Sequence, residues 1–184
     1  MNLSRWHLEQ AARIILKGGV ISYPTEAVYG LGCDPWDLWA VSRILSLKKR
    51  SISKGLIVIA SCPEQLESLI VYPDQKIRNR ILSSWPGPNT WVLPASAQCP
   101  WWLTGAHDGL AVRVTAHPLC RMLCEMAGPI VSTSANIAEK SAARTAWKVQ
   151  MIFNNRLDMI LRGSTSGEAG PTRIRDAITG KQLR

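Results

Sequence analysis

Apolar positions along the chain follow two spacings in turn, which predicts strands and helices in alternation. Short uninterrupted apolar runs predict buried strands at residues 20–23, 55–60, 90–94, 110–115, 129–133 and 157–161. Apolar positions three or four residues apart predict helices at residues 8–16, 63–70, 73–85, 118–127 and 145–153, and another that starts at Asp34. This alternation favours an α/β (α+β) fold, in which residues 1–184 form one domain with a single-layer, twisted, mixed sheet flanked by helices.

Capping residues and prolines predict where these elements begin and end. Asp34 is placed to cap a helix with Pro35 at its first position and Asp37 in its first turn. Pro24 is expected to stop the ladder of the first strand, and Thr145 is expected to cap the helix that follows it.

Polar side chains follow the first predicted strand. A hydroxyl (Thr25), a carboxylate (Glu26) and a phenol (Tyr29) precede Gly30 and Gly32. Polar groups on a glycine-containing loop beyond a strand are typical of ligand sites in α/β proteins. The glycines fit an ordinary turn equally well, so this loop alone leaves both interpretations open.

A cationic segment follows the helix that starts at Asp34. Lys48, Arg50 and Lys54 are expected on a loop between that helix and a buried strand. A solvated charge cluster at a helix C-terminus explains them partly, because the helix dipole favours cations there. The alternative is that they converge on a triphosphate, with Arg50 supplying the planar fork suited to phosphate oxygens.

Two further groups could bind ligands. Ser134 and Asn136 lie in a run of hydroxyls at an expected strand end, where a plain turn needs no function. Arg113 interrupts an apolar run, which is costly unless the cation is paired or exposed. It is either a solvated arginine on a sheet edge or the partner of a carboxylate.

Composition and charge narrow the range of partners. The chain has 184 residues, 46% hydrophobic and 19% charged, which fits one globular domain. No apolar stretch approaches the ~18 residues of a membrane span, and residues 1–10 lack the apolar core of an export signal. We therefore expect a cytoplasmic protein with no membrane partner. A net charge of +9 favours an anionic partner such as a nucleotide or nucleic acid.

Several common site types are absent from the sequence. The five cysteines form no CxxC pair, so no protein metal site is expected. Neither a P-loop motif nor a complete G-x-G-x-x-G is present. His107 and His117 have no serine or cysteine nucleophile placed to pair with them, and both are interpreted as structural.

Five segments occur in an order that resembles a known family. They are P-T-E-A-V-Y-G-L-G-C-D, L-K-K-R-x-x-x-K-G-L-I-V-I, S-W-P-G-P-N-T, L-A-V-R-V and S-T-S-A-N. Together they are very similar to the YrdC/TsaC family of threonylcarbamoyl-AMP synthases, which begin the threonylcarbamoyl modification of tRNA. The resemblance runs from about residue 20 to the end of the chain and implies a YrdC-like fold with a basic concave cleft.

The resemblance also implies roles for individual residues. Contacts to ATP are implied for Lys48, Arg50, Lys54, Ser134, Asn136, Arg144 and Arg184, with Lys48 and Arg50 as the catalytic pair. Contacts to the amino-acid substrate are implied for Thr25, Arg113, Ser134 and Thr172, and Arg113 would bind its carboxylate. The chain departs from many relatives at Ala27, where they have threonine, and at Thr172, where the family has serine.

The implied reaction joins L-threonine, bicarbonate or CO2, and ATP into threonylcarbamoyl-AMP, with release of diphosphate. Mg²⁺ is expected on the triphosphate, held mainly by its oxygens, and the downstream partners would be tRNA threonylcarbamoyl-transfer proteins. The rival hypothesis is a non-catalytic RNA-binding module that acts on tRNA or ribosomal RNA through its basic surface. The net charge fits both.

Overall fold

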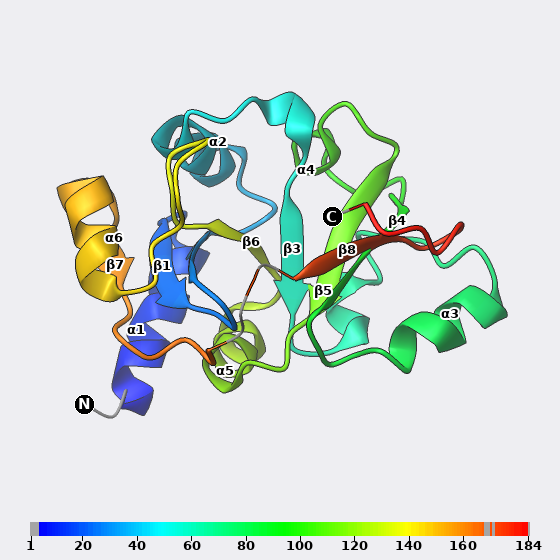
Figure 1. The fold of residues 1–184 in the computed structure, drawn as a ribbon, viewed down its shortest axis with the longest axis horizontal. Helices are drawn as coiled ribbons and strands as arrows, with labels where there is room; N and C mark the ends of the chain where they lie inside the picture. The colour runs from blue at the N-terminus through cyan, green and yellow to red at the C-terminus, as the bar shows by residue number, and fades with distance from the viewer. Residues whose placement is uncertain (1–3, 168–169, 171, 184) are drawn as a thin grey trace.

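The structure, a computed structural model, describes residues 4–167, 170 and 172–183. Within these residues eight strands form one sheet in the order β7-β1-β2-β6-β3-β5-β4-β8 (Figure 1). Their bounds are β1 Ile21–Pro24, β2 Tyr29–Gly32, β3 Ile57–Ala60, β4 Asn89–Pro94, β5 Gly109–Val114, β6 Ile130–Ser134, β7 Met159–Ile160 and β8 Arg173–Asp176.

Parallel and antiparallel pairings both occur, so the predicted mixed sheet is confirmed. Strands β3 and β5 run parallel, as do β1 with β7 and β4 with β8. The remaining neighbours are antiparallel. The two segments that contribute most polar groups to the site, the β1–β2 hairpin and the end of β6, are therefore hydrogen-bonded neighbours.

Helices cover both faces of the sheet. Their bounds are α1 Arg5–Leu16, α2 Leu38–Lys48, α3 Gln75–Leu82, α4 Trp101–Thr104, α5 Pro118–Ala127 and α6 Ala146–Phe153, with 3₁₀ turns η1 Ile52–Lys54, η2 Pro63–Leu66 and η3 Asn154–Arg156. Figure 1 shows α2 and α4 along the upper side and α1 with α5 along the lower side. Among the described residues no helix is long and apolar enough to cross a membrane.

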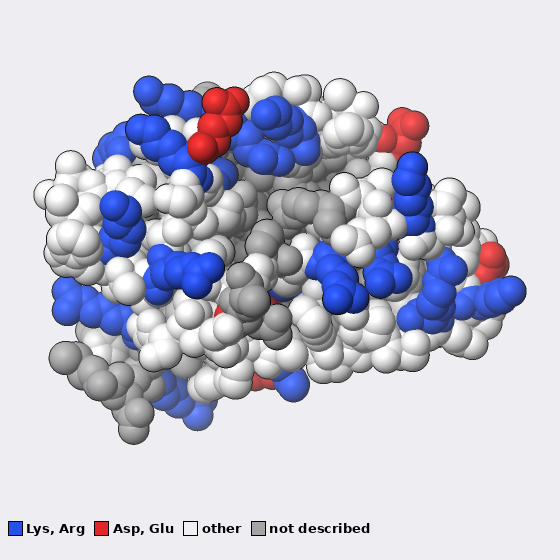
Figure 2. Space-filling model, viewed as in Figure 1, with Lys and Arg blue, Asp and Glu red and all other residues white. Residues whose placement is uncertain are grey.

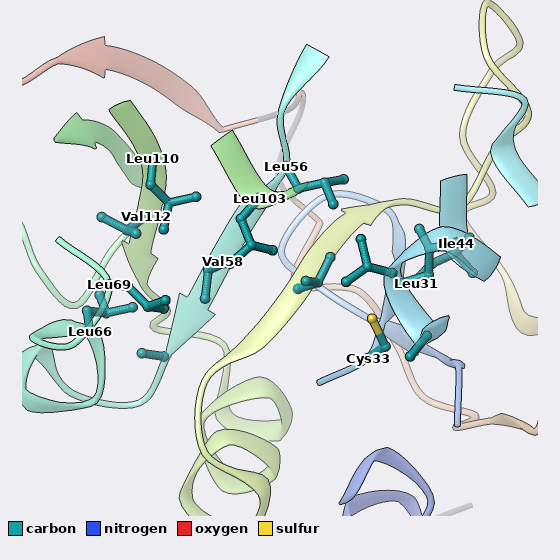
Figure 3. Close-up of a cluster of buried hydrophobic side chains, with 14 of the residues drawn as sticks. Leu31, Cys33, Ile44, Leu56, Val58, Leu66, Leu69, Leu103, Leu110 and Val112 are labelled. Atoms are coloured by element: carbon teal, nitrogen blue, oxygen red, sulfur yellow. The ribbon is translucent and has the colours of Figure 1, made fainter. Parts of the chain in front are cut away.

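Two buried clusters hold these layers together. One lies under α1 and α5 and includes Leu8, Ile59 and Leu123. The other extends from α2 across the sheet, where Leu31 and Ile44 meet near β6 (Figure 3). Burying one such side chain contributes roughly 1.5–3 kcal/mol, so these clusters fix the strands whose ends carry the site.

The structure corrects the predicted loop after β1. Residues 29–32 form strand β2, and Gly30 and Gly32 are strand residues rather than turn residues. A Cβ at Gly32 would lie 2.7 Å from the ring of Tyr23 and 2.8 Å from the Val131 carbonyl oxygen. Close packing between neighbouring strands therefore accounts for this glycine.

Three helix predictions are also corrected. The helix expected from Asp34 begins at Leu38, and Asp37 caps it by accepting from the N–H groups of Trp39 and Ala40. The helix expected over residues 63–70 is the short turn η2, and the helix expected over 73–85 is shortened to α3. Helix α4, which starts at Trp101, was not among the predicted helices.

Candidate active site

A cavity of about 530 Å³ opens near the centre of the sheet. It is lined by the β1–β2 hairpin, the segment after α2, strand β5, the end of β6 and strand β8. Figure 2 shows a hollow near the centre of one face, with Lys and Arg side chains on both sides of it. The expected basic concave cleft is therefore present, and its lining cations are Arg50, Lys54 and Arg113.

Arg113 is a buried cation in the interior of the sheet. It lies on β5, opposite Ile59 of the neighbouring β3, and only 5% of its surface is exposed. The alternative of a solvated arginine on a sheet edge is therefore wrong. Its Nη2 lies 3.3 Å from Glu26 Oε2, while Nε and Nη1 have no hydrogen-bond partner among the described residues.

The unpartnered N–H groups make Arg113 suited to an anionic ligand. A buried donor without a partner costs roughly 1–3 kcal/mol, and a guanidinium matches the planar geometry of a carboxylate. A carboxylate that entered the cavity would relieve this cost. The predicted carboxylate partner for Arg113 is thus compatible with the geometry.

Thr25 lies at the turn of the β1–β2 hairpin and lines the same cavity. Its Oγ1 donates to the Val28 carbonyl oxygen at 2.7 Å, and its own N–H donates to the same oxygen at 3.0 Å. These bonds hold the hairpin turn, and the hydroxyl oxygen keeps acceptor capacity for a ligand.

Lys48 is positioned differently from the sequence-based expectation. It is the last residue of α2, not a loop residue, and only 3% of its surface is exposed. Its Nζ donates to the Ser134 carbonyl oxygen, and at 3.0 Å to both the carbonyl oxygen and Oδ1 of Asn136. Lys48 does not line the cavity, so in this structure it fastens the segment after β6 to α2.

Asn136 shares this structural role. Its Oδ1 also accepts from Ser134 Oγ at 2.7 Å, and its Nδ2 donates to the carbonyl oxygens of Ile137 and Lys140. Ser134 lines the cavity but Asn136 does not. Their predicted contacts to ATP stay predictions.

The environment of Lys48 alters its proton affinity. Burial, together with the smaller effect of the nearby Arg50 cation, lowers its pKa from 10.5 to about 8. The ammonium donates to three oxygens of Ser134 and Asn136. Loss of its proton would therefore weaken the contacts that hold these two residues in place.

Arg50 and Lys54 lie on the cavity wall after α2. Arg50 is half-buried and donates through Nη2 to the carbonyl oxygens of Gly55 at 2.9 Å and Lys54 at 3.2 Å. Lys54 is exposed at the end of η1. Two of the three predicted phosphate-binding cations thus face one cavity.

The remaining predicted residues divide between three locations. Thr172 lines the main cavity next to β8, with its Oγ1 3.3 Å from Thr90 Oγ1. Arg144 lines a separate cavity of about 370 Å³, which it shares with Arg162 and Tyr29. Arg184 lies outside the described residues.

Two polar residues contact one another beside Arg113, in an arrangement that the sequence did not predict. Glu26 is buried, and its Oε1 accepts from Thr115 Oγ1 at 2.8 Å. Glu26 was visible in the sequence as a carboxylate next to Thr25, but its pairing with Arg113 crosses 87 positions of sequence. Thr115 carried no signal, because it reads as an ordinary strand end.

The described residues contain no group of three or more His, Cys, Asp or Glu side chains arranged to hold a metal ion. Two carboxylates line the cavity, Glu26 and Asp176. Glu26 pairs with Arg113, and Asp176 Oδ1 accepts from Ile178 and Thr179.

Comparisons with known proteins agree with this architecture. A family model named Sua5/YciO/YrdC, described as "Telomere recombination", matches residues 13–184. A threonylcarbamoyl-AMP synthase of Pseudomonas fluorescens is 50% identical over 183 residues, covering 99% of this chain and 98% of that protein. The protein of the same name from Pseudomonas aeruginosa is 49% identical over 182 residues, with the same coverage.

A solved structure extends the similarity to three dimensions. P. abyssi Sua5, complexed with L-threonine, superposes with a TM-score of 0.92 and 33% identity. The match covers 100% of this chain and 55% of the Sua5 chain, so this chain spans about half the length of that protein. Sequence and fold together show that the chain belongs to the Sua5/YciO/YrdC family.

Proposed function

We propose that the protein is a threonylcarbamoyl-AMP synthase, the enzyme of the first step in threonylcarbamoyl modification of tRNA. The name of the relatives that are about 50% identical over almost the whole chain supports this activity. The observation that carries it within the structure is one cavity with two cationic regions, Arg113 on β5 and Arg50 with Lys54 after α2.

The two regions suit the two anionic parts of the substrates. The carboxylate of L-threonine would pair with the unpartnered N–H groups of Arg113, and the triphosphate of ATP would lie along Arg50 and Lys54. Thr25, Ser134 and Thr172 line the same cavity. P. abyssi Sua5 has been solved with L-threonine, which supports the choice of amino acid.

The reaction then proceeds by alignment and charge stabilisation. The threonine amine combines with CO2 and loses a proton to give a carbamate, and a carbamate oxygen attacks the α-phosphorus of ATP. The bond from that phosphorus to the bridging oxygen breaks, and diphosphate leaves with the electron pair. Because a carbamate is already anionic, no nucleophilic side chain is required, and catalysis rests on positioning and on cations around the phosphates.

The reaction also involves a metal ion, bicarbonate and the proteins that receive the product. Mg²⁺ enters as part of the ATP substrate, and bicarbonate is the source of the carbamoyl carbon. The product passes to proteins that transfer the threonylcarbamoyl group to tRNA, which favours a cytoplasmic location. Residues 1–184 act as one domain, because the hairpin near the start of the described chain and β8 near its end line the same cavity.

Diphosphate assays test this function. The purified protein is incubated with ATP and Mg²⁺, with or without L-threonine and bicarbonate. We expect diphosphate release that requires both, and an adenylate product with the mass of threonylcarbamoyl-AMP. Release that is indifferent to threonine, or tRNA binding with no release at all, would favour the RNA-binding module instead.

A further inference from the structure

A chain of buried polar contacts lies beside the cavity. The backbone N–H of His117 donates to Thr115 Oγ1 at 3.2 Å. Thr115 Oγ1 donates to Glu26 Oε1 at 2.8 Å, and Glu26 Oε2 lies 3.3 Å from Arg113 Nη2. All four residues are buried, so water competes little for these contacts.

The direction of these bonds fixes the Glu26 carboxylate. The Thr115 hydroxyl receives the N–H of His117, so its own proton is available to Glu26. An ionised carboxylate only accepts hydrogen bonds. One oxygen of Glu26 is therefore held by Thr115 from the end of β5, and its other oxygen forms an ion pair with the Arg113 guanidinium but no hydrogen bond to a described residue.

The same contacts restrict the orientation of Arg113. A guanidinium is planar and presents its donors in a fixed fork, so an ion pair at Nη2 limits how the whole group can turn. Nε and Nη1 are left without partners among the described residues. Both are buried atoms, and they are the donors left without a described partner on a residue that lines the cavity.

We propose that Glu26 is a positioning residue: held by Thr115, it orients the Arg113 guanidinium so that its remaining N–H groups receive the carboxylate of the amino-acid substrate. The inference rests on the proposed function, because it assigns a role within the same site. It predicts that Glu26 governs how well the protein recognises a carboxylate, although Glu26 itself need not touch the substrate.

A purely structural ion pair would behave differently. If Glu26 did no more than neutralise a buried cation, its loss would lower stability and weaken all ligands of the cavity in a similar proportion. A positioning role acts on the carboxylate contact alone. Two ligands that differ only in the carboxylate distinguish a positioning role from a structural one, because only a positioning role changes the ratio of their affinities.

Calorimetry with L-threonine and L-threoninamide measures this ratio, because threoninamide has an uncharged amide in place of the carboxylate. We expect wild-type protein to bind threonine more tightly than threoninamide. In Glu26→Gln the ratio of the two affinities should fall by about tenfold, the size of one charge-assisted hydrogen bond. The KM for ATP should change much less than the KM for threonine.

A matched control is available at the surface. Glu125 forms an exposed pair with Arg121 on α5, with 3.7 Å between Glu125 Oε1 and Arg121 Nη2. Glu125→Gln removes the same charge from a Glu–Arg pair far less buried than that of Glu26, and should leave the ratio unchanged.

Variants of Thr115 keep the test decisive if Glu26→Gln does not fold. Thr115→Val removes the hydroxyl with little change of shape and should lower the ratio, whereas Thr115→Ser restores the donor and should recover it. Equal weakening of threonine and threoninamide in Glu26→Gln or Thr115→Val would overturn the inference. A wild-type protein with no threonine-dependent diphosphate release would instead refute the proposed function on which the inference depends.

Discussion

Lys48 and Arg50 are two positions apart, yet they have different environments. Lys48 is buried and bonded to oxygens of the segment after β6, whereas Arg50 is half-buried and lines the cavity. The structure therefore separates a residue that organises the site from one that can reach a phosphate. Substitutions at the two positions should fail in different ways.

Arg50→Ala should reduce diphosphate release with little loss of stability. Removing one cationic donor from a transferring phosphate raises the barrier by roughly 2–4 kcal/mol, and a half-buried side chain leaves no large core cavity. Steady-state assays and thermal unfolding measure the two effects. Lys49→Gln is the control, because exposed Lys49 lies outside the cavity lining; equal activity losses in both variants would contradict the assignment.

Lys48 should make the activity depend on pH. Its pKa is lowered to about 8 by burial and, secondarily, by Arg50, so the ammonium that holds Ser134 and Asn136 loses its proton as the pH rises through 8. The ratio of wild-type activity to that of Lys48→Met should fall over the same range, because both proteins share the titration of the substrates. A ratio that is flat across that range would count against this role.

Stability should follow the opposite trend at this residue. The pKa of Lys48 is lower in the folded protein than the usual 10.5, so between these values the unfolded chain binds more protons. The contribution of Lys48 to the free energy of unfolding therefore increases from about pH 8 to 10.5, while the full cost of burying its charge is present below pH 8. Lost activity above pH 8 would thus not reflect unfolding caused by Lys48.

Arg113→Lys should weaken threonine binding more than ATP binding. A lysine keeps the charge but cannot reproduce the planar fork of a guanidinium, and it would also lose the fixed pairing with Glu26. Calorimetry with each ligand separately measures the two affinities. Unchanged threonine affinity in a folded variant would remove Arg113 from the amino-acid site.

At the scale of elements, helix α2 has its capping residue, Asp37, at one end and Lys48, which contacts the segment after β6, at the other. Asp37 accepts from Trp39 N at 2.8 Å and Ala40 N at 3.1 Å, and Lys48 ends the same helix. The position of Lys48 therefore depends on the helix being formed along its full length.

Asp37→Ala should lower the free energy of unfolding by about 1 kcal/mol, the usual cost of a lost N-cap. Asp37→Asn should lower it much less, because asparagine keeps a capping oxygen. Asp34→Ala tests the alternative cap suggested by the sequence; Asp34 accepts from Trp36 N ahead of the helix. Denaturant titration compares the three variants, and a larger loss at Asp34 than at Asp37 would contradict the observed cap.

Residues that end an element are visible in the sequence, whereas close packing between strands is not. Helix α5 was predicted with its observed bounds, because Pro118 and Gly128 mark both ends, and Thr145 was identified correctly as the cap of α6. Strand β2 was missed because glycines normally indicate turns, whereas Gly32 is required by the nearby Tyr23 ring. Capping residues, prolines and glycines identify where helices end. They carry no information on how closely neighbouring strands approach each other.

The same limit applies to the site. Arg113 stood out because a cation in an apolar run needs a partner, and that reasoning is local. The partner is Glu26, and the contacts of Lys48 are at residues 134 and 136. These pairs depend on which strands and helices lie side by side in the fold, so the sequence identified the residues as candidates without giving their contacts.

At the scale of the whole molecule, the positive charge is spread over the surface. Figure 2 shows Lys and Arg side chains across the visible face, around the hollow and well beyond it, and the chain carries a net charge of +9. Such a surface attracts nucleic acid through its phosphates without reading sequence.

We expect tRNA binding that weakens steeply with salt, and threonine-dependent diphosphate release in the complete absence of RNA. Counterion release dominates contacts of this kind, while the cavity holds groups for small anions. Filter binding at several salt concentrations and diphosphate assays with added ribonuclease measure the two properties. Activity that appeared after tRNA was added, and disappeared with ribonuclease, would move the RNA into the active site.

Strand β8 gives the cavity one wall at the edge of the sheet, and residues 181–183 hydrogen-bond to the side of β8 that faces away from β4. It pairs with β4 at the edge of the sheet, and Ile174 and Asp176 line the cavity together with residues of the β1–β2 hairpin. A ligand in contact with both would join an edge strand to the centre of the molecule. A substitution in β8 that displaces this wall would therefore change substrate binding without touching the substrate.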